Sequence, residues 1–151
     1  MTPEDSATTL SKVELRWVED DVFVGSDSDG HSLVFDSSIP SKARVRQRGI
    51  GPMNALLASL GACSGMDVAA ILLKRKQKLG SLKVEVSGKR PQYGLPKPFT
   101  EVHLKFVLEG TDLDEAYVKE AVTDSVTKFC SVAATVSAKA KIGFSYEIAQ
   151  A

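Results

Sequence analysis

The sequence predicts an α+β fold, and two observations favour this class. Apolar residues alternate with polar ones over residues 13–18, 81–89 and 101–110, which is the period of a half-buried strand. They recur every three or four positions over residues 52–79 and 112–129, which is the period of an amphipathic helix. The resulting order is strands, a long helix, two strands, a second helix and a last strand, which is typical of an α+β domain.

Length and composition indicate an ordinary globular protein. With 151 residues, 43% of them hydrophobic and 25% charged, we expect one domain over residues 12–151, preceded by a flexible leader at residues 1–11. The formal net charge is zero, so no general attraction to nucleic acid or to an anionic membrane is expected. The polar start does not resemble a signal peptide, and the apolar run "VAAILL" is too short to span a bilayer, so we expect a cytoplasmic protein.

The first strands precede the long helix. Val13, Leu15 and Trp17 alternate with polar or charged residues and predict a half-buried strand. The stretch "DVFVGSDSDGHSLVFD" predicts a hairpin around a Ser/Asp/Gly turn. The stretch "ARVRQRGIGP" is interpreted as an edge strand that runs into a glycine-rich bend.

The long helix is expected to be the central one. It begins at Pro52, a residue that suits the first helical position because its missing N–H is not needed there. The basic run "KRKQK" predicts the last turn of the helix, since cations are favourable at a helix C-terminus. Gly80 is expected to follow the last turn as the C-terminal cap. The helix is then about 27 residues long, more than twice the usual length in globular proteins.

The second half predicts two alternating strands, "SLKVEVSGK" and "TEVHLKFVLEG", and then a second helix. We expect Asp112 to cap that helix, with Glu115 three residues further on and Cys130 at its C-terminal end. The stretch "VAATVSAK" predicts a short helical turn, and a last strand with apolar residues at 142, 144, 146 and 148 ends the fold.

Neither histidine indicates a catalytic or metal site. His103 lies on the polar face of its strand and His31 in the hairpin turn, so both are expected on the surface. The chain has no His-x-x-x-His or Cys/His spacing of a zinc site and no phosphate-binding loop, so we expect neither a metal nor another cofactor.

Cys63 lies among small residues in "LGACSGMD", although each glycine inside a helix costs about 1 kcal/mol relative to alanine. The small neighbours would let a substrate or another backbone approach the sulfur. Two other interpretations stay open: a point where the helix crosses another element, and a buried, inert thiol.

Asp67 follows Cys63 by four residues and therefore shares its helix face. A carboxylate alone would raise the thiol pKa and make Cys63 less reactive, so Asp67 makes chemical sense only if it also holds a cation. The nearest supply is "ARVRQR", with Arg44, Arg46 and Arg48, because an arginine beside the sulfur favours the thiolate. The alternative for each arginine is a solvated edge strand.

Residues 12–149 resemble the OsmC/Ohr family of osmotically induced and organic hydroperoxide resistance proteins. The resemblance rests on "GIGPMNALLASLGACSG" and "KFCSVAATV", and the helix type "CSGMDV" is similar to that of an OsmC-like subgroup. It implies antiparallel sheets around a long central helix and an intertwined homodimer with two sites at the subunit interface, without a cofactor.

The resemblance also implies roles for individual residues. Cys63 would attack the O–O bond of an organic hydroperoxide and become a sulfenic acid, and Cys130 would condense with it to a disulfide that a dithiol reductant reopens. Arg44 would stabilise the Cys63 thiolate, and Arg46 is the alternative residue for this role. The function implied is a thiol-dependent peroxidase in the response to oxidative stress.

Two departures from the family pattern affect this function. Met53 stands where the peroxidases have a glutamate that holds the arginine, and Ser131 stands where they tend to have proline. We hypothesise that Asp67 replaces the missing carboxylate. The alternative function is a non-catalytic binding protein in which Met53, Leu57 and Met66 line a site for an apolar or acyl-like ligand; a structural dimer with inert thiols is a third.

Overall fold

The computed structural model describes residues 8–37 and 47–149. The chain divides into two compact units, Met1–Ala55 and Leu56–Ala151. The expectation of one domain over residues 12–151, after a leader at residues 1–11, stays a prediction.

The first unit holds a three-stranded antiparallel sheet of β1 (Val13–Glu19), β2 (Val22–Asp27) and β3 (Ser32–Phe35) in the order β1-β2-β3. The predicted hairpin is confirmed between β2 and β3. The predicted burial of the first strand is wrong, because every residue of β1 is exposed and Trp17 retains 64% of its accessible surface. Among residues 8–37 and 47–149, β1 pairs with β2 alone and is the edge strand of this sheet.

Arg48 lies in the segment that leads to the long helix, and acidic residues of the first unit hold it. Its guanidinium pairs with Glu19 and with Asp20, the latter at 3.0 Å. Its backbone N–H donates to the buried carboxylate of Asp36 at 2.9 Å. Arg44 and Arg46 lie outside the described residues, as does the first part of the predicted edge strand, residues 43–46. In its described part, Ile50 forms a bridge with Phe35.

The second unit is built on a sheet of β4 (Lys78–Lys89), β5 (Glu101–Thr111) and β6 (Lys141–Ala149) in the order β4-β5-β6. β4 and β5 are antiparallel, but β5 and β6 are parallel. The expectation of purely antiparallel sheets is therefore wrong for this pair. A parallel neighbour needs a crossover, and here the chain makes one through helices between β5 and β6.

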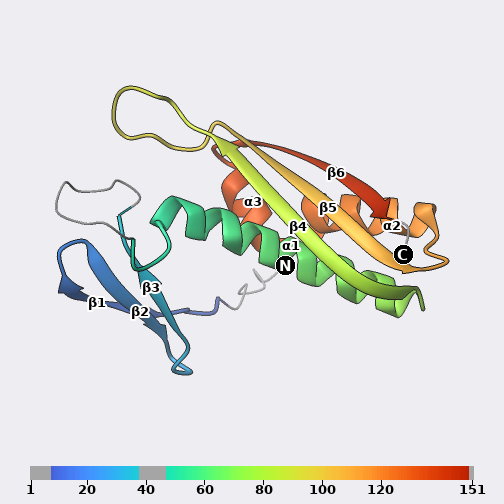
Figure 1. The fold of residues 1–151 in the computed structure, drawn as a ribbon, viewed down its shortest axis with the longest axis horizontal. Helices are drawn as coiled ribbons and strands as arrows, with labels where there is room; N and C mark the ends of the chain where they lie inside the picture. The colour runs from blue at the N-terminus through green and yellow to red at the C-terminus, as the bar shows by residue number, and fades with distance from the viewer. Residues whose placement is uncertain (1–7, 38–46, 150–151) are drawn as a thin grey trace, which may run out of the picture. The chain divides into compact units, whose positions relative to one another are not determined.

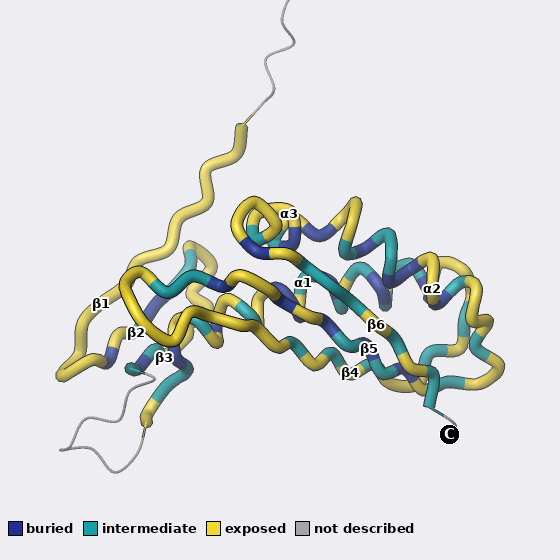
Figure 2. Tube along the Cα trace, turned by 90° about the horizontal axis from the view of Figure 1, so that it is seen from above, coloured by how far each residue is buried: buried dark blue, intermediate teal, exposed yellow. Residues whose placement is uncertain are grey.

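One face of this sheet is covered by helices, as Figure 1 shows: α1 (Pro52–Lys74) runs under the strands, with α2 (Glu115–Asp124) and α3 (Ser131–Ser137) on the same side. A π-helical turn, η1 (Ser125–Phe129), joins α2 to Cys130. Alternate residues of β5 from Val102 to Leu108 are buried, whereas Glu101, His103 and Glu109 are exposed, and the colour of the tube changes along this strand accordingly (Figure 2). The core comprises Leu60, Val68, Leu72, Val102, Leu104, Phe106, Leu108, Val118 and Val122.

The long helix α1 begins at Pro52, as predicted, but ends at Lys74 and not next to Gly80. Lys76 takes the left-handed conformation (φ 58°) expected of the glycine, and the N–H groups of Lys76 and Gln77 bond to the carbonyls of Leu73 and Leu72. These two bonds close the helix in a Schellman motif. Gly80 lies inside β4, because the pairing of β4 with β5 begins at Lys78.

The second helix is capped by Asp114 and not by Asp112. The Asp114 side chain accepts the N–H of Ala116 at 2.8 Å, which satisfies a donor in the first turn of α2. Asp112 adopts a positive φ of 51° in the turn after β5. The short helical turn predicted near the C-terminus is confirmed as α3.

Within the described residues, α1 is also the helix that could cross a membrane by length and composition alone. The sequence-based expectation that the apolar run is too short therefore does not hold for the helix as a whole. The core helix of a soluble protein passes the same test, and Leu60, Val68 and Leu72 of α1 are fully buried against the rest of their unit.

The two glycines that flank Cys63 face the sheet. A Cβ atom on Gly61 would lie 2.8 Å from Cγ2 of Val86, and one on Gly65 would lie 3.2 Å from Cγ2 of Val84. Both valines belong to β4. The glycines thus mark a point where α1 crosses a strand closely, which is one of the interpretations that the sequence left open.

Gly61→Ala is therefore expected to destabilise the protein despite the better helix propensity of alanine. The propensity gain of about 1 kcal/mol is outweighed by overpacking, which typically costs about 1–3 kcal/mol. Gly65→Ala, with its wider spacing, serves as the matched variant and is expected to be close to neutral. Denaturant unfolding at a fixed protein concentration measures both. Equal stability of the two variants would contradict the close contact at Gly61.

Candidate functional site

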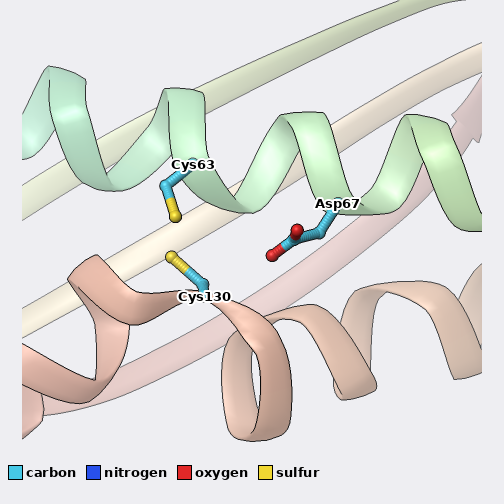
Figure 3. Close-up of side chains that lie close together, drawn as sticks. All are labelled: Cys63, Asp67 and Cys130. Carbon is cyan, nitrogen blue, oxygen red and sulfur yellow. The ribbon is translucent and has the colours of Figure 1, made fainter. Parts of the chain in front are cut away.

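The two cysteines, which are far apart in the sequence, meet between two helices (Figure 3). Cys63 projects from α1, and Cys130 is the residue that directly precedes α3. Both are free thiols. Their sulfur atoms and a carboxylate oxygen of Asp67 all lie within 4.8 Å of one another. Cys130 is buried, whereas Cys63 and Asp67 are half-buried, so the cluster is sheltered but not closed.

Local structure places each group. Cys63 and Asp67 are four residues apart on α1, so both side chains point to the same side of that helix. Cys130 has extended backbone angles (φ −69°, ψ 108°), which interrupt the helical path after η1 and start α3 in a new direction. Its sulfur accepts the N–H of Ala133 at 3.3 Å and acts as the N-cap of α3, a role that serine, threonine, aspartate or asparagine usually fills.

The surroundings of Cys63 favour its protonated form. Burial raises the pKa of the Cys63 thiol, and a hydrogen bond with Cys130 raises it further. The backbone N–H of Val132 donates to the sulfur and partly lowers this pKa, while the electrostatic effects of Cys130 and of the Asp67 carboxylate add to the increase. None of the ion pairs within residues 8–37 and 47–149 involves Asp67, so no described cation offsets these effects.

Ser125 is a member of the site that the sequence analysis missed. Its hydroxyl donates to the carbonyl oxygen of Ser64 at 3.0 Å and lies 3.3 Å from Oδ2 of Asp67. These two contacts connect the π-helical turn η1 to the part of α1 that carries Cys63 and Asp67. A signal was present, because Ser125 continues the buried helix face of Val118 and Val122 with a polar side chain.

The structure brings together only part of the predicted site. Met53 lies in the first turn of α1, which at 1.5 Å per residue puts it roughly 15 Å from Cys63 along the helix axis. Leu57 is half-buried near Gly88 of β4, and Met66 keeps 71% of its surface exposed. Their role in ligand binding stays a prediction, as does that of Arg44 and Arg46.

Both histidines are on the surface, as expected. His103 bonds to the hydroxyl of Ser145 at 2.9 Å on the exposed face of the sheet. His31 bonds to Asp27 in the hairpin turn of the first unit. Neither belongs to the cysteine cluster, which is consistent with a site that uses thiols and a carboxylate.

Asp67→Asn is expected to lower the pKa of Cys63, because it removes one of the negative charges that raise it. Thiolate forms as pH rises through the pKa, so the curve of reaction rate against pH should move to lower pH. The rate of alkylation by iodoacetamide measures this best in a Cys130→Ser background, where a single thiol reacts. In denaturant the two proteins should titrate alike. An unchanged curve in the folded state would show that Asp67 does not act on the thiol.

The sequence of this chain is similar to a known family and to known sequences. The family model described as "OsmC-like protein" matches residues 45–145. Protein YhfA of Escherichia coli (strain K12) is 34% identical over 140 residues, which cover 93% of this chain and 99% of that protein.

Solved structures share the fold. A protein from Aquifex aeolicus VF5 superposes with a TM-score of 0.82 at 30% identity, over 95% of this chain and 99% of the other. The organic hydroperoxide resistance protein OhrB of Bacillus subtilis superposes with a TM-score of 0.63 at 20% identity, over 93% of this chain and all of the other. At that identity, the second likeness shows the fold alone.

Proposed function

Because the chain belongs to the OsmC-like protein family, we propose that it reduces organic hydroperoxides with Cys63 as the attacking and Cys130 as the resolving thiol. Membership of this family supports a redox or hydroperoxide-resistance role in general. One observation carries the specific cysteine-pair mechanism. The two free sulfur atoms lie within 4.8 Å of each other although they come from separate helices.

The chemistry proceeds in two balanced steps. The thiolate of Cys63 attacks one oxygen of the hydroperoxide, the O–O bond breaks, and the alkoxide takes up a proton to leave as an alcohol. Cys63 is then a sulfenic acid. The sulfur of Cys130 attacks the sulfur of Cys63, water leaves and a disulfide forms. An external dithiol reduces this disulfide and restores both thiols.

The neighbouring groups support these steps in different ways. The N–H of Val132 donates to the Cys63 sulfur and favours the thiolate that attacks. We assign further stabilisation of the Cys63 thiolate to Arg44, with Arg46 as the alternative residue. Ser125 orients Asp67 through their contact at 3.3 Å, and Asp67 acts as the carboxylate that positions such a cation.

The proposal extends to assembly and location. OsmC-like proteins are typically homodimers, and a homodimer would cover apolar side chains that are exposed in the single chain. On α1 these are Leu56, Met66 and Leu73, and on β1 they include Leu15 and Trp17. A cytoplasmic location suits the two free thiols, since reducing compartments keep cysteines reduced.

The test is whether one equivalent of cumene hydroperoxide joins Cys63 to Cys130. Fully reduced protein is mixed with the peroxide, quenched at intervals with an alkylating agent and analysed by intact mass and peptide mapping. The expected product is an intramolecular disulfide that forms within seconds and that a dithiol reverses. Thiols that both survive excess peroxide for many minutes would contradict the proposal.

A binding protein for an apolar ligand is the second candidate, favoured by the exposure of Met66 in the turn that follows Cys63. It would hold an acyl-like guest against Met53, Leu57 and Met66. A fatty acid that raises the melting temperature while both thiols stay unreactive toward peroxide would support this candidate over the peroxidase.

A further inference from the structure

The cysteine cluster also has the composition of a metal site. It joins three acidic groups, two thiols and a carboxylate, whose ligand atoms converge within 4.8 Å. In the part of the chain that the structure describes, no ion pair neutralises Asp67. A carboxylate beside two thiols makes chemical sense when a cation sits between them. We propose that reduced Cys63, reduced Cys130 and Asp67 bind a thiophilic divalent cation of the Zn²⁺ type.

The donor set selects the metal. Two thiolates favour a borderline or soft cation over Mg²⁺ or Ca²⁺, which prefer sites made wholly of oxygen ligands. Zn²⁺ bonds to sulfur at about 2.3 Å and to carboxylate oxygen at about 2.0–2.2 Å, so two ligand atoms on a tetrahedral ion lie roughly 3.4–3.8 Å apart. The three ligand atoms lie within 4.8 Å of one another, so side-chain rotations would have to bring them into this range when the ion binds. Three protein ligands leave a fourth tetrahedral position for water.

The groups around the ligands hold them in place. Ser125 lies 3.3 Å from Oδ2 of Asp67, and the N–H of Ala133 donates to the sulfur of Cys130 at 3.3 Å. Such outer hydrogen bonds orient metal ligands and are a regular feature of protein metal sites. Cys130 is buried and Cys63 half-buried, so the site is dry enough to strengthen binding while an ion can still enter.

Metal binding and peroxide reduction would exclude each other at this site. Zn²⁺ displaces two thiol protons when it binds, so its affinity should rise with pH. A disulfide between the same sulfur atoms offers no thiolate, so the oxidised protein should lose the ion. The inference uses the geometry of the proposed function but does not depend on peroxide chemistry.

From the sequence we expected no metal, because the chain lacks the local ligand spacings of a zinc site. The structure supplies a different arrangement, in which Cys63 and Asp67 lie one helical turn apart on α1 and Cys130 reaches them from the start of α3. Only a contact between distant segments assembles these three ligands.

The experiment titrates chelator-treated, fully reduced protein with Zn²⁺ against a chromophoric zinc chelator, in the absence of peroxide. Co²⁺ is the spectroscopic probe, because sulfur ligands give it an intense charge-transfer band. One equivalent per chain is expected. Cys63→Ser, Cys130→Ser and the isosteric Asp67→Asn should each weaken binding by roughly 10-fold or more, and the disulfide form should not bind.

Asp27→Asn is the matched control, since Asp27, Asp29 and His31 form a second, exposed cluster in the first unit. This variant should bind Zn²⁺ like the wild type. Binding that is lost with Asp27→Asn, unaffected by Asp67→Asn or absent altogether would overturn the inference. A protein that binds no Zn²⁺ but forms the disulfide with peroxide would refute only the metal site, whereas the reverse result would refute only the peroxidase.

Discussion

Cys63→Ser is expected to lower the rate of cumene hydroperoxide consumption by roughly 10³-fold or more, because a serine hydroxyl is a far weaker nucleophile than a thiol. Cys130→Ser should behave differently. It keeps the attacking thiol and removes only the group that resolves the sulfenic acid. The first reaction should then proceed and stop after one turnover, with the sulfenic acid trapped on Cys63.

The different behaviour of these two variants would identify Cys63 as the attacking thiol and Cys130 as the resolving thiol. A sulfenic-acid probe such as dimedone should label Cys130→Ser at Cys63 and leave Cys63→Ser unlabelled, with peroxide consumption followed in parallel. Circular dichroism checks that both variants fold, since Cys130 also caps α3. If Cys130→Ser consumed peroxide through repeated turnovers with the dithiol, Cys130 would not be the resolving residue. Labelling of Cys130 in Cys63→Ser would reverse the two roles.

Leu104→Ala is expected to destabilise the protein by about 3–5 kcal/mol, the range seen when a fully buried leucine is truncated without collapse of the site. Leu104 lies in the middle strand β5, is completely buried, and has strands on both sides that limit relaxation of the cavity. Urea unfolding at a fixed protein concentration gives the free energy of unfolding and allows for a dimer.

Leu95→Ala is the control for this prediction, because it makes the same truncation at a side chain that is 91% exposed in the loop between β4 and β5. Its effect should stay within about 0.5 kcal/mol. A Leu104→Ala effect below about 2 kcal/mol would contradict a tightly packed interior around β5.

Local chemistry was sufficient for several features of the fold. Proline chemistry predicted the start of α1 at Pro52, and strict alternation predicted the buried face of β5. Helical spacing placed Cys63 and Asp67 on one side of α1, where the structure has them. Each of these features depends on residues within a few positions of one another, so their pattern is visible in the sequence.

Other features depended on partners that are distant in the chain. The end of α1 was predicted at Gly80, but β4 begins at Lys78 because it pairs with β5, and Lys76 makes the turn instead. The parallel alignment of β5 and β6 results from the crossover through α2 and α3. Propensity cannot show either outcome, because long-range pairing decides between local alternatives of similar energy.

The candidate site likewise has features that the sequence shows and features that only the fold decides. The sequence alone singled out Cys63 by its small neighbours and Cys130 by the resemblance to a family, but the small neighbours proved to face β4. Only the tertiary structure brought Cys130 and Ser125 to the side of α1 that carries Cys63 and Asp67. The physical reason is that the reactivity of a thiol depends on the charges and hydrogen-bond donors around it, and most of these come from another segment of the chain.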